Sequence, residues 1–235
     1  MSTRETRSQA IGDKPKAGPC PRARRAPAKI AAAGEPPRTT DAASALAELA
    51  LSLFLEHGYD ATPMSQVAER AGLTKAGVYH HFESKEHLLY VVHKRHIEQL
   101  LLPMIDAAER EPDPEKRLRS FLGEYALLQT RDPSLRLLIN ETKRLLPAHQ
   151  EEIREAWRRG LHLVRNAIAE LQRQRSSSRK HDPTHAAFAA IGMCSWICNW
   201  FDYQRPAGGP AVARTMIDIF LNGLLLPPAR KRGSD

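Results

Sequence analysis

The chain has 235 residues, of which 26% are charged, and a formal net charge of +8. This length can hold one or two domains with a hydrophobic core. No apolar run of about 18 residues exists and no apolar segment follows the first basic residues, so we expect neither a membrane span nor a secretory signal, and a cytoplasmic location. Apolar residues recur at helical intervals rather than alternating as in strands, which predicts an all-α fold.

Most of the positive charge lies at the start of the chain. Residues 1–38 contain nine Lys or Arg against three acidic residues, together with six prolines and few large apolar side chains. Such a segment cannot bury enough surface to fold, so we expect a disordered basic arm. The arm would add contacts to DNA phosphates or to the minor groove. A flexible leader without such a role, or a misassigned start site, is the alternative.

The first predicted helix begins near Thr40 or Asp41 and ends at His57-Gly58. Its apolar residues fall at i, i+3, i+4, i+7 and i+8, the spacing of one buried stripe. This stripe comprises Leu46, Leu49, Ala50, Leu53 and Phe54.

Two short helices follow with helix-turn-helix spacing. Thr62 is the candidate N-cap of the first, with Pro63 at its first helical position, and Val67, Ala68 and Ala71 form its inner face. Gly72 is placed for a left-handed turn residue, Leu73 is expected to fill the turn, and Thr74 caps a helix from Lys75 to about Phe82 with Val78 inward. A helix-turn-helix places its second helix in the major groove of DNA. An ordinary helical hairpin would not require small, glycine and apolar residues at these positions.

Residues 58–89 resemble the DNA-binding domain of TetR-type transcriptional repressors. The matching residues are Phe54, Gly58-Tyr59, Thr62, Val67-Ala68, Ala71-Gly72, Thr74-Lys75, Tyr79, Phe82, Ser84-Lys85-Glu86 and Leu88. The resemblance implies roles at specific positions. Tyr79, His80 and Lys85 would hold phosphates, and Thr62, Ser65 and Thr74 would offer hydroxyls or helix N-termini to the backbone. Lys75, Ala76 and Gly77 would lie against base edges, with Lys75 able to pair with guanine.

The rest of the chain reads as a larger helical region. Ser84 caps a helix from Lys85 that Pro103 kinks or breaks, and further helices are expected over about 114–130, 133–146 and 148–175. Asp182-Pro183 and Pro210 begin the last two. We therefore expect about nine helices in all, divided into the arm (1–38), a helix-turn-helix head (39–85), a ligand-binding and dimerisation body (86–228) and a tail (229–235).

The last two helices are too apolar for the surface of a monomer, so we expect a two-fold homodimer through this pair. TetR-like repressors dimerise in this way. The apolar residues concerned are Phe188, Ile191, Trp196, Trp200, Phe201, Ile217, Phe220, Leu221, Leu224 and Leu225.

A second, looser resemblance covers the C-terminal part. The stretches RDPSLRLLINETKRLLP and NWFDYQRPAGGP are similar to a TetR subgroup whose members respond to acyl-CoA thioesters, although Asp202 and Gln204 interrupt its aromatic-basic run. It implies a small apolar effector. Apolar lining would come from Trp157, Phe188, Trp196 and Trp200, and phosphate contacts from arginines such as Arg158, Arg159, Arg165 and Arg205. Core or dimer packing for the tryptophans, and a solvated face for Arg158 and Arg159, are the alternatives.

The remaining chemistry-bearing residues point to no catalytic or metal site. Cys194 and Cys198 lie four residues apart, but nothing completes a metal-binding pattern, so we expect buried apolar roles and no cofactor; Cys20 lies in the arm. His93 and His96 are expected on a helix surface. The sequence thus predicts a DNA-binding regulator released by an effector. A constitutive or activating regulator is one alternative, and a helical enzyme or adaptor is another.

Overall fold

A computed structural model describes residues 39–175 and 180–225, and every regular element in these two ranges is a helix. The predicted arm with Cys20, the tail, and the side chain of Leu225 lie outside the described part. None of the described helices is long and apolar enough to cross a membrane. The all-α prediction is confirmed.

The head is formed by α1 (Thr39–His57), α2 (Met64–Ala71) and α3 (Lys75–His81). The predicted stripe of α1 faces inward, and only Leu49 of its five residues is partly exposed. It packs on Met64, Val67 and Ala68 of α2. Leu73 was expected to fill the turn between α2 and α3, and that expectation was wrong. Its side chain is 44% exposed, and Met64 is buried instead.

One continuous helical rod leads from the head into the body. It consists of α4 (Lys85–His96), a π-helical segment η1 (Ile97–Leu101) and α5 (Leu102–Glu109). Pro103 was expected to kink or break the helix here. The break is absent: the wider turn, in which the Leu102 N–H donates to the Ile97 carbonyl, precedes Pro103 and accommodates its ring and its missing N–H.

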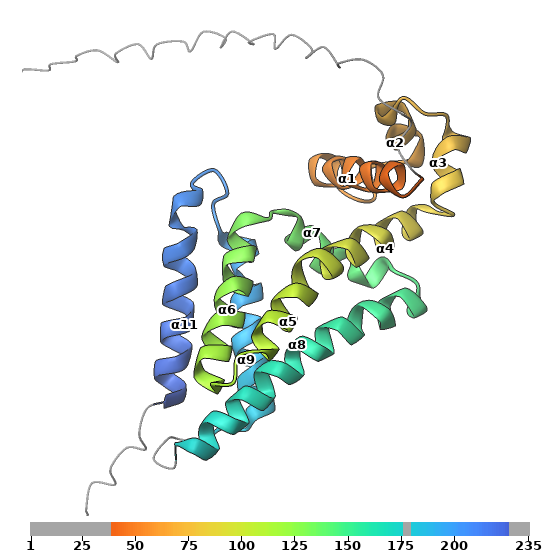
Figure 1. Ribbon diagram of the computed structural model, residues 1–235. Coiled ribbons are helices and arrows are strands. Elements are labelled where there is room, and N and C mark those ends of the chain that lie inside the picture. Colours follow the sequence, from red (N-terminus) through yellow and green to blue (C-terminus); the bar gives the residue numbers. More distant parts are fainter. Residues whose placement is uncertain (1–38, 176–179, 226–235) are drawn as a thin grey trace, which may run out of the picture. The chain divides into compact units, whose positions relative to one another are not determined.

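The body is built around α6 (Pro114–Arg131), which contacts α5, α8, α9, α10 and α11 (Figure 1). α7 (Ser134–Glu141) continues into the 3₁₀ turn η2 (Thr142–Arg144). The long α8 (Pro147–Gln174) runs beside α4, η1 and α5. Three segments complete the fold: α9 (Pro183–Ser195), α10 (Ile197–Trp200) and, after η3 (Pro206–Gly208), α11 (Gly209–Leu225).

Most predicted helix bounds agree with these to within a residue or two, and the exceptions have local causes. The helix expected over 133–146 ends earlier: α7 gives way to the 3₁₀ turn after Glu141, and Leu145 and Leu146, the latter before Pro147, are both extended. Asp182 caps α9 as expected, its Oδ1 accepting from the backbone N–H groups of Thr184 and His185. Counting α4–α5 and α9–α10 as single interrupted helices gives nine in the described ranges, the predicted number.

Candidate functional site

The turn between α2 and α3 has the geometry that the sequence predicts. Gly72 lies in the left-handed region at φ 67°, and its N–H donates to carbonyls at the end of α2. Thr74 then caps α3, because its Oγ1 accepts from the Gly77 N–H at 3.0 Å. Val78 is fully buried and fixes α3 against the head. These contacts set which face of α3 points outward.

The outward face of α3 is polar and basic. Lys75, Ala76, Tyr79 and His80 are exposed, as is Ser65 on α2. The Lys75 ammonium lies 5.9 Å from the centroid of the Tyr79 ring, and no residue of α3 is acidic. Gly77 is half-buried beside them. Hydrogen-bond donors and a small-residue surface on one helix can approach base edges and phosphates together.

Thr62 has a different role from the predicted one. Its side chain is fully buried, and its hydroxyl donates to the carbonyls of Gly58 at 2.8 Å and Leu53 at 3.3 Å. The N-cap of α2 is Pro63, which has no side-chain cap bond. Because the Thr62 hydroxyl is already used to close the end of α1, it cannot serve as a phosphate contact, and we correct that assignment.

Lys85 connects α4 to the loop between α1 and α2. Its Nζ donates to the Asp60 carbonyl at 3.2 Å and lies 4.3 Å from the centroid of the Tyr59 ring. Partial burial lowers the pKa of Lys85. The residue therefore stabilises the head in addition to any contact with DNA.

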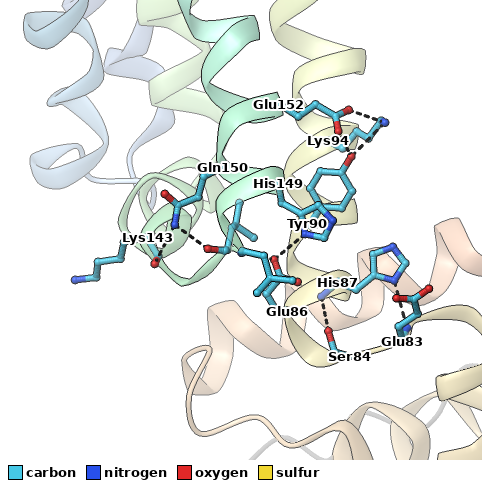
Figure 2. A network of polar contacts seen from close by, with 12 residues as sticks. Glu83, Ser84, Glu86, His87, Tyr90, Lys94, Lys143, His149, Gln150 and Glu152 are labelled. Carbon is cyan, nitrogen blue, oxygen red and sulfur yellow. Dashed lines mark hydrogen bonds and ion pairs between the residues drawn. The ribbon is translucent and has the colours of Figure 1, made fainter.

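A polar cluster, which we call the α4–α8 clamp, joins the start of α4 to the start of α8 (Figure 2). Glu86 Oε1 accepts from the Leu146 N–H and from His149 Nδ1, both at 2.8 Å. The His149 ring stacks on Tyr90 with centroids 3.8 Å apart. The Tyr90 hydroxyl donates to Glu152, which also pairs with Lys94 at 2.7 Å. The clamp ties the helix that follows α3 to a helix of the body.

The body contains a partly open cavity of about 50 Å³ between the α4–η1 part of the rod, α6, α7 and α8. Its walls are almost entirely apolar. The lining residues are His93, His96, Ile97, Leu100, Leu101, Tyr125, Leu128, Leu135, Leu138, Ile139, Thr142 and Trp157.

An open groove of about 390 Å³ adjoins this cavity, and the two share the walls formed by Tyr125, Ile139, Thr142 and Trp157. Arg154 lies on the groove. Ligand sites commonly measure roughly 300–1,000 Å³ and are lined mainly by apolar groups. Cavity and groove together have the size and character of such a site.

Of the predicted ligand residues, only Trp157 lines this cavity. Phe188 of α9, Trp196 between α9 and α10, and Trp200 of α10 are 59%, 65% and 49% exposed. They point away because the opposite face of α9, with Ala187, Ala190 and Cys194, packs into the core. None of the three lines this cavity or the adjoining groove.

The predicted arginines do not reach the cavity either. Arg158 pairs with Glu151 and Glu155 on its own helix, and Arg165 bonds the neighbouring Asn166. The solvated-face alternative holds for Arg158. Arg154, which the sequence reasoning missed, is the arginine at the groove. The sequence around Arg154, between Ile153 and Trp157, does not indicate that this arginine lies on a groove, because three other helices also form the groove.

His93 and His96 were expected on a helix surface; that expectation was wrong for His93, and His96 is partly exposed. His93 is buried at 5% exposure and lies in the cavity wall. His96 contacts Asp132 Oδ2 at 3.2 Å and Ser134 Oγ at 3.0 Å. Although burial would raise the pKa of Asp132, hydrogen bonds from His96 and Ser134 lower it. The histidines thus link the rod to the cavity and to α7.

Cys194 and Cys198 are both buried, as the sequence predicts. Burial raises the pKa of each thiol. In the described ranges no group of three or more His, Cys, Asp or Glu is arranged to hold a metal ion.

The geometry is that of a helix-turn-helix DNA-binding head joined to a helical body with an apolar cavity. Residues 46–91 match the family described as bacterial regulatory proteins, tetR family, and residues 111–224 match the tetracyclin repressor-like, C-terminal domain. Together these ranges cover more than half of the chain.

Three proteins of known name are similar to this chain. The HTH-type transcriptional repressor KstR2 of Rhodococcus jostii (strain RHA1) is 25% identical over 195 residues, 77% of this chain and 90% of that protein. The HTH-type transcriptional activator FasR of Mycolicibacterium smegmatis is 34% identical over 76 residues, 32% of this chain and 35% of that protein. The solved structure of AibR in complex with isovaleryl coenzyme A and operator DNA superposes with a TM-score of 0.70 at 26% identity, covering 80% of this chain and 100% of that one.

The chain belongs to the TetR family of bacterial transcriptional regulators. It is therefore a DNA-binding regulator, and the alternative of a helical enzyme or adaptor is set aside.

Proposed function

We propose that the protein is a homodimeric repressor that binds a pseudo-palindromic operator and is released by a small, largely apolar effector. The observation that carries the DNA half is the exposed basic face of α3, fixed by the Thr74 cap and buried Val78. The similarity to KstR2, itself a repressor, supports the sign of regulation.

Lys75, Ala76 and Gly77 contact base edges in this proposal, whereas Ser65, Thr74, Tyr79, His80 and Lys85 contact the backbone. Lys75→Ala should then relax the preference for operator over scrambled DNA, and Lys85→Ala should weaken binding to both. Because Lys85 also holds the Asp60 carbonyl, the Lys85→Ala protein must be shown to retain its folded head by thermal melting. Equal losses on both DNAs for Lys75→Ala would contradict its base-reading role.

The dimer interface in this proposal is the outer face of α9 and α11. Phe188, Trp196 and Ile219 are exposed there, and a groove of about 540 Å³ lies between the two helices. Trp196→Glu should convert the dimer to a monomer of 26.3 kDa in light scattering, while Trp157→Phe should not. A wild-type protein that is already monomeric at micromolar concentration would exclude the dimer.

The effector proposed for the cavity and groove is an acyl-CoA-like thioester. The apolar cavity suits an acyl group, and Arg154 on the groove would bind an anionic head outside it by exchanging its present partner, Glu151 of the same helix. AibR, a structural relative, is bound to isovaleryl coenzyme A. Trp157 belongs to both spaces and would contact the ligand where it enters.

Effector and DNA are coupled in this proposal through the α4–η1 rod and the α4–α8 clamp. The rod carries cavity residues at one end and follows α3 at the other. An effector that fits one spacing of the two heads better than the other weakens operator binding, and operator must weaken effector binding by the same factor. Identical effector affinity with and without operator would exclude this mechanism.

The decisive experiment is a mobility shift of the purified full chain on the DNA upstream of its own gene, at stated salt, with a panel of acyl-CoA thioesters and their free acids. Release by a thioester but not by its acid supports the proposal. Specific binding that no thioester releases keeps the regulator and discards this effector class.

An activator is the second candidate, because FasR, a related regulator, is an activator. A promoter-fusion assay in cells lacking the gene separates the two. Reporter expression rises without a repressor and falls without an activator.

A further inference from the structure

His93 is the one strongly buried polar side chain in the cavity wall whose Nε2 lacks a hydrogen-bond partner in the described ranges. The other polar groups of the wall are occupied. The Thr142 hydroxyl donates to the Leu138 carbonyl, the Tyr125 hydroxyl bonds Ser195, and His96 contacts Asp132 and Ser134. Buried polar groups without partners are uncommon in folded proteins, because each has lost its bonds to water. The His93 imidazole therefore lines the apolar cavity with one hydrogen-bonding atom that no described residue uses.

The imidazole is uncharged at neutral pH. Burial, together with a smaller contribution from the neighbouring His96, lowers the pKa of His93 to about 4. Protonating it at pH 7 would be disfavoured by roughly a thousandfold. A neutral His93 therefore gives no positive charge to pair with the carboxylate of a buried ligand. A neutral imidazole can instead donate a hydrogen bond to an uncharged oxygen or accept one from it.

We propose that His93 is a specificity-determining residue, pairing with a single uncharged oxygen, a ketone or a hydroxyl, on the buried part of the effector. This inference rests on the proposed function only in that the cavity is taken as the effector site. The ligand class becomes an apolar group that carries one neutral oxygen, and a saturated hydrocarbon or an ionised acid of the same shape is disfavoured at this point.

The test compares cyclohexanone and cyclohexanol with methylenecyclohexane, a hydrocarbon of nearly the same shape as the ketone. Binding to the full chain is measured for wild type, for His93→Phe, and for Thr142→Val as the control. Thr142 lines the same cavity, but its hydroxyl already donates to the Leu138 carbonyl of α7. Because hydrocarbons leave water more readily, the informative quantity is the ratio of oxygenated to hydrocarbon affinity, compared between variants.

The expected result is a ratio about 5- to 10-fold lower in His93→Phe than in wild type for the ketone or the alcohol, and unchanged in Thr142→Val. Equal ratios in all three proteins, or no binding of any probe to the wild type, would overturn the proposal. If His93→Phe fails to fold, ¹⁵N spectra of the wild-type imidazole decide. The oxygenated probes should shift the His93 nitrogen resonances and the hydrocarbon should not, and equal shifts would overturn it.

The thioester panel keeps this test separate from the proposed function. If the ratio of oxygenated to hydrocarbon affinity depends on His93 but no thioester releases the operator, the role of His93 is kept and the thioester effector is discarded. Release by a thioester with an unchanged ratio keeps the effector class and discards the role of His93.

Discussion

Replacing Glu86 by Ala should destabilise the protein and loosen the head from the body. The carboxylate accepts two bonds through Oε1, from the Leu146 N–H at the start of α8 and from His149 Nδ1. Losing the first is comparable to losing a helix cap, about 1 kcal/mol, and the charge-assisted bond is worth about 1.5–3 kcal/mol. The buried Oε2 has no partner among the described residues, so removing the carboxylate also relieves a desolvation cost of about 1 kcal/mol. The net loss should be about 2 kcal/mol.

The measurement is urea unfolding of the full chain at one fixed protein concentration, since the proposed dimerisation would contribute to the apparent stability. Glu86→Gln keeps an acceptor oxygen and should cost about 1 kcal/mol. Glu83→Ala removes the same charge three residues earlier from an exposed side chain and should change stability by less than about 0.5 kcal/mol.

Effector titrations with operator present extend this test to function. If the α4–α8 clamp carries coupling, Glu86→Ala should reduce the factor by which effector weakens operator binding, while effector affinity in the absence of DNA stays nearly constant. A Glu86→Ala protein as stable as Glu83→Ala, with unchanged coupling, would refute the reasoning.

Four further predictions concern single residues. Gly72→Ala should lower the free energy of unfolding by about 1–2 kcal/mol in chemical unfolding, because φ is 67°, although the space for a Cβ is open. Gly77→Ala, inside α3, should instead raise the free energy of unfolding by up to about 1 kcal/mol and should weaken operator binding in a mobility shift. Gln129→Met should raise the unfolding free energy by about 1–2 kcal/mol, because Gln129 is fully buried with neither amide atom bonded, and a loss of stability would show that the amide has a partner. His93 binds a proton near pH 6.5 when unfolded but only near pH 4 when folded, so the free energy of unfolding should fall by about 3 kcal/mol as the pH drops between those values. Unfolding of His93→Phe should lack this part of the loss. An equal loss of stability in wild type and His93→Phe would contradict the prediction.

The head could be read from the sequence because its determinants are local. A left-handed glycine at 72, a hydroxyl cap at Thr74 and the spacing of apolar residues in α1 each act within a few positions along the chain. Thr62 is the exception. A threonine before a proline predicts a cap, but the Gly58 carbonyl, brought back by the turn after α1, takes its hydroxyl instead.

The cavity could not be read in the same way. Its walls come from four segments between residues 93 and 157, and no local pattern states which face of each helix they share. Tryptophans and arginines were chosen for their chemistry, yet α9 packs its small residues inward and leaves Phe188 and Trp196 outside.

Sequence alone therefore determined the helical class, the helix-turn-helix and most helix ends, since capping, glycine conformation and apolar period depend on near neighbours. Only the tertiary structure decided that His93 is buried and neutral, that Trp157 is the predicted tryptophan facing the cavity, and that Glu86 caps a helix sixty residues away. Burial and electrostatic environment depend on which helices meet, and that is set by packing over the whole chain.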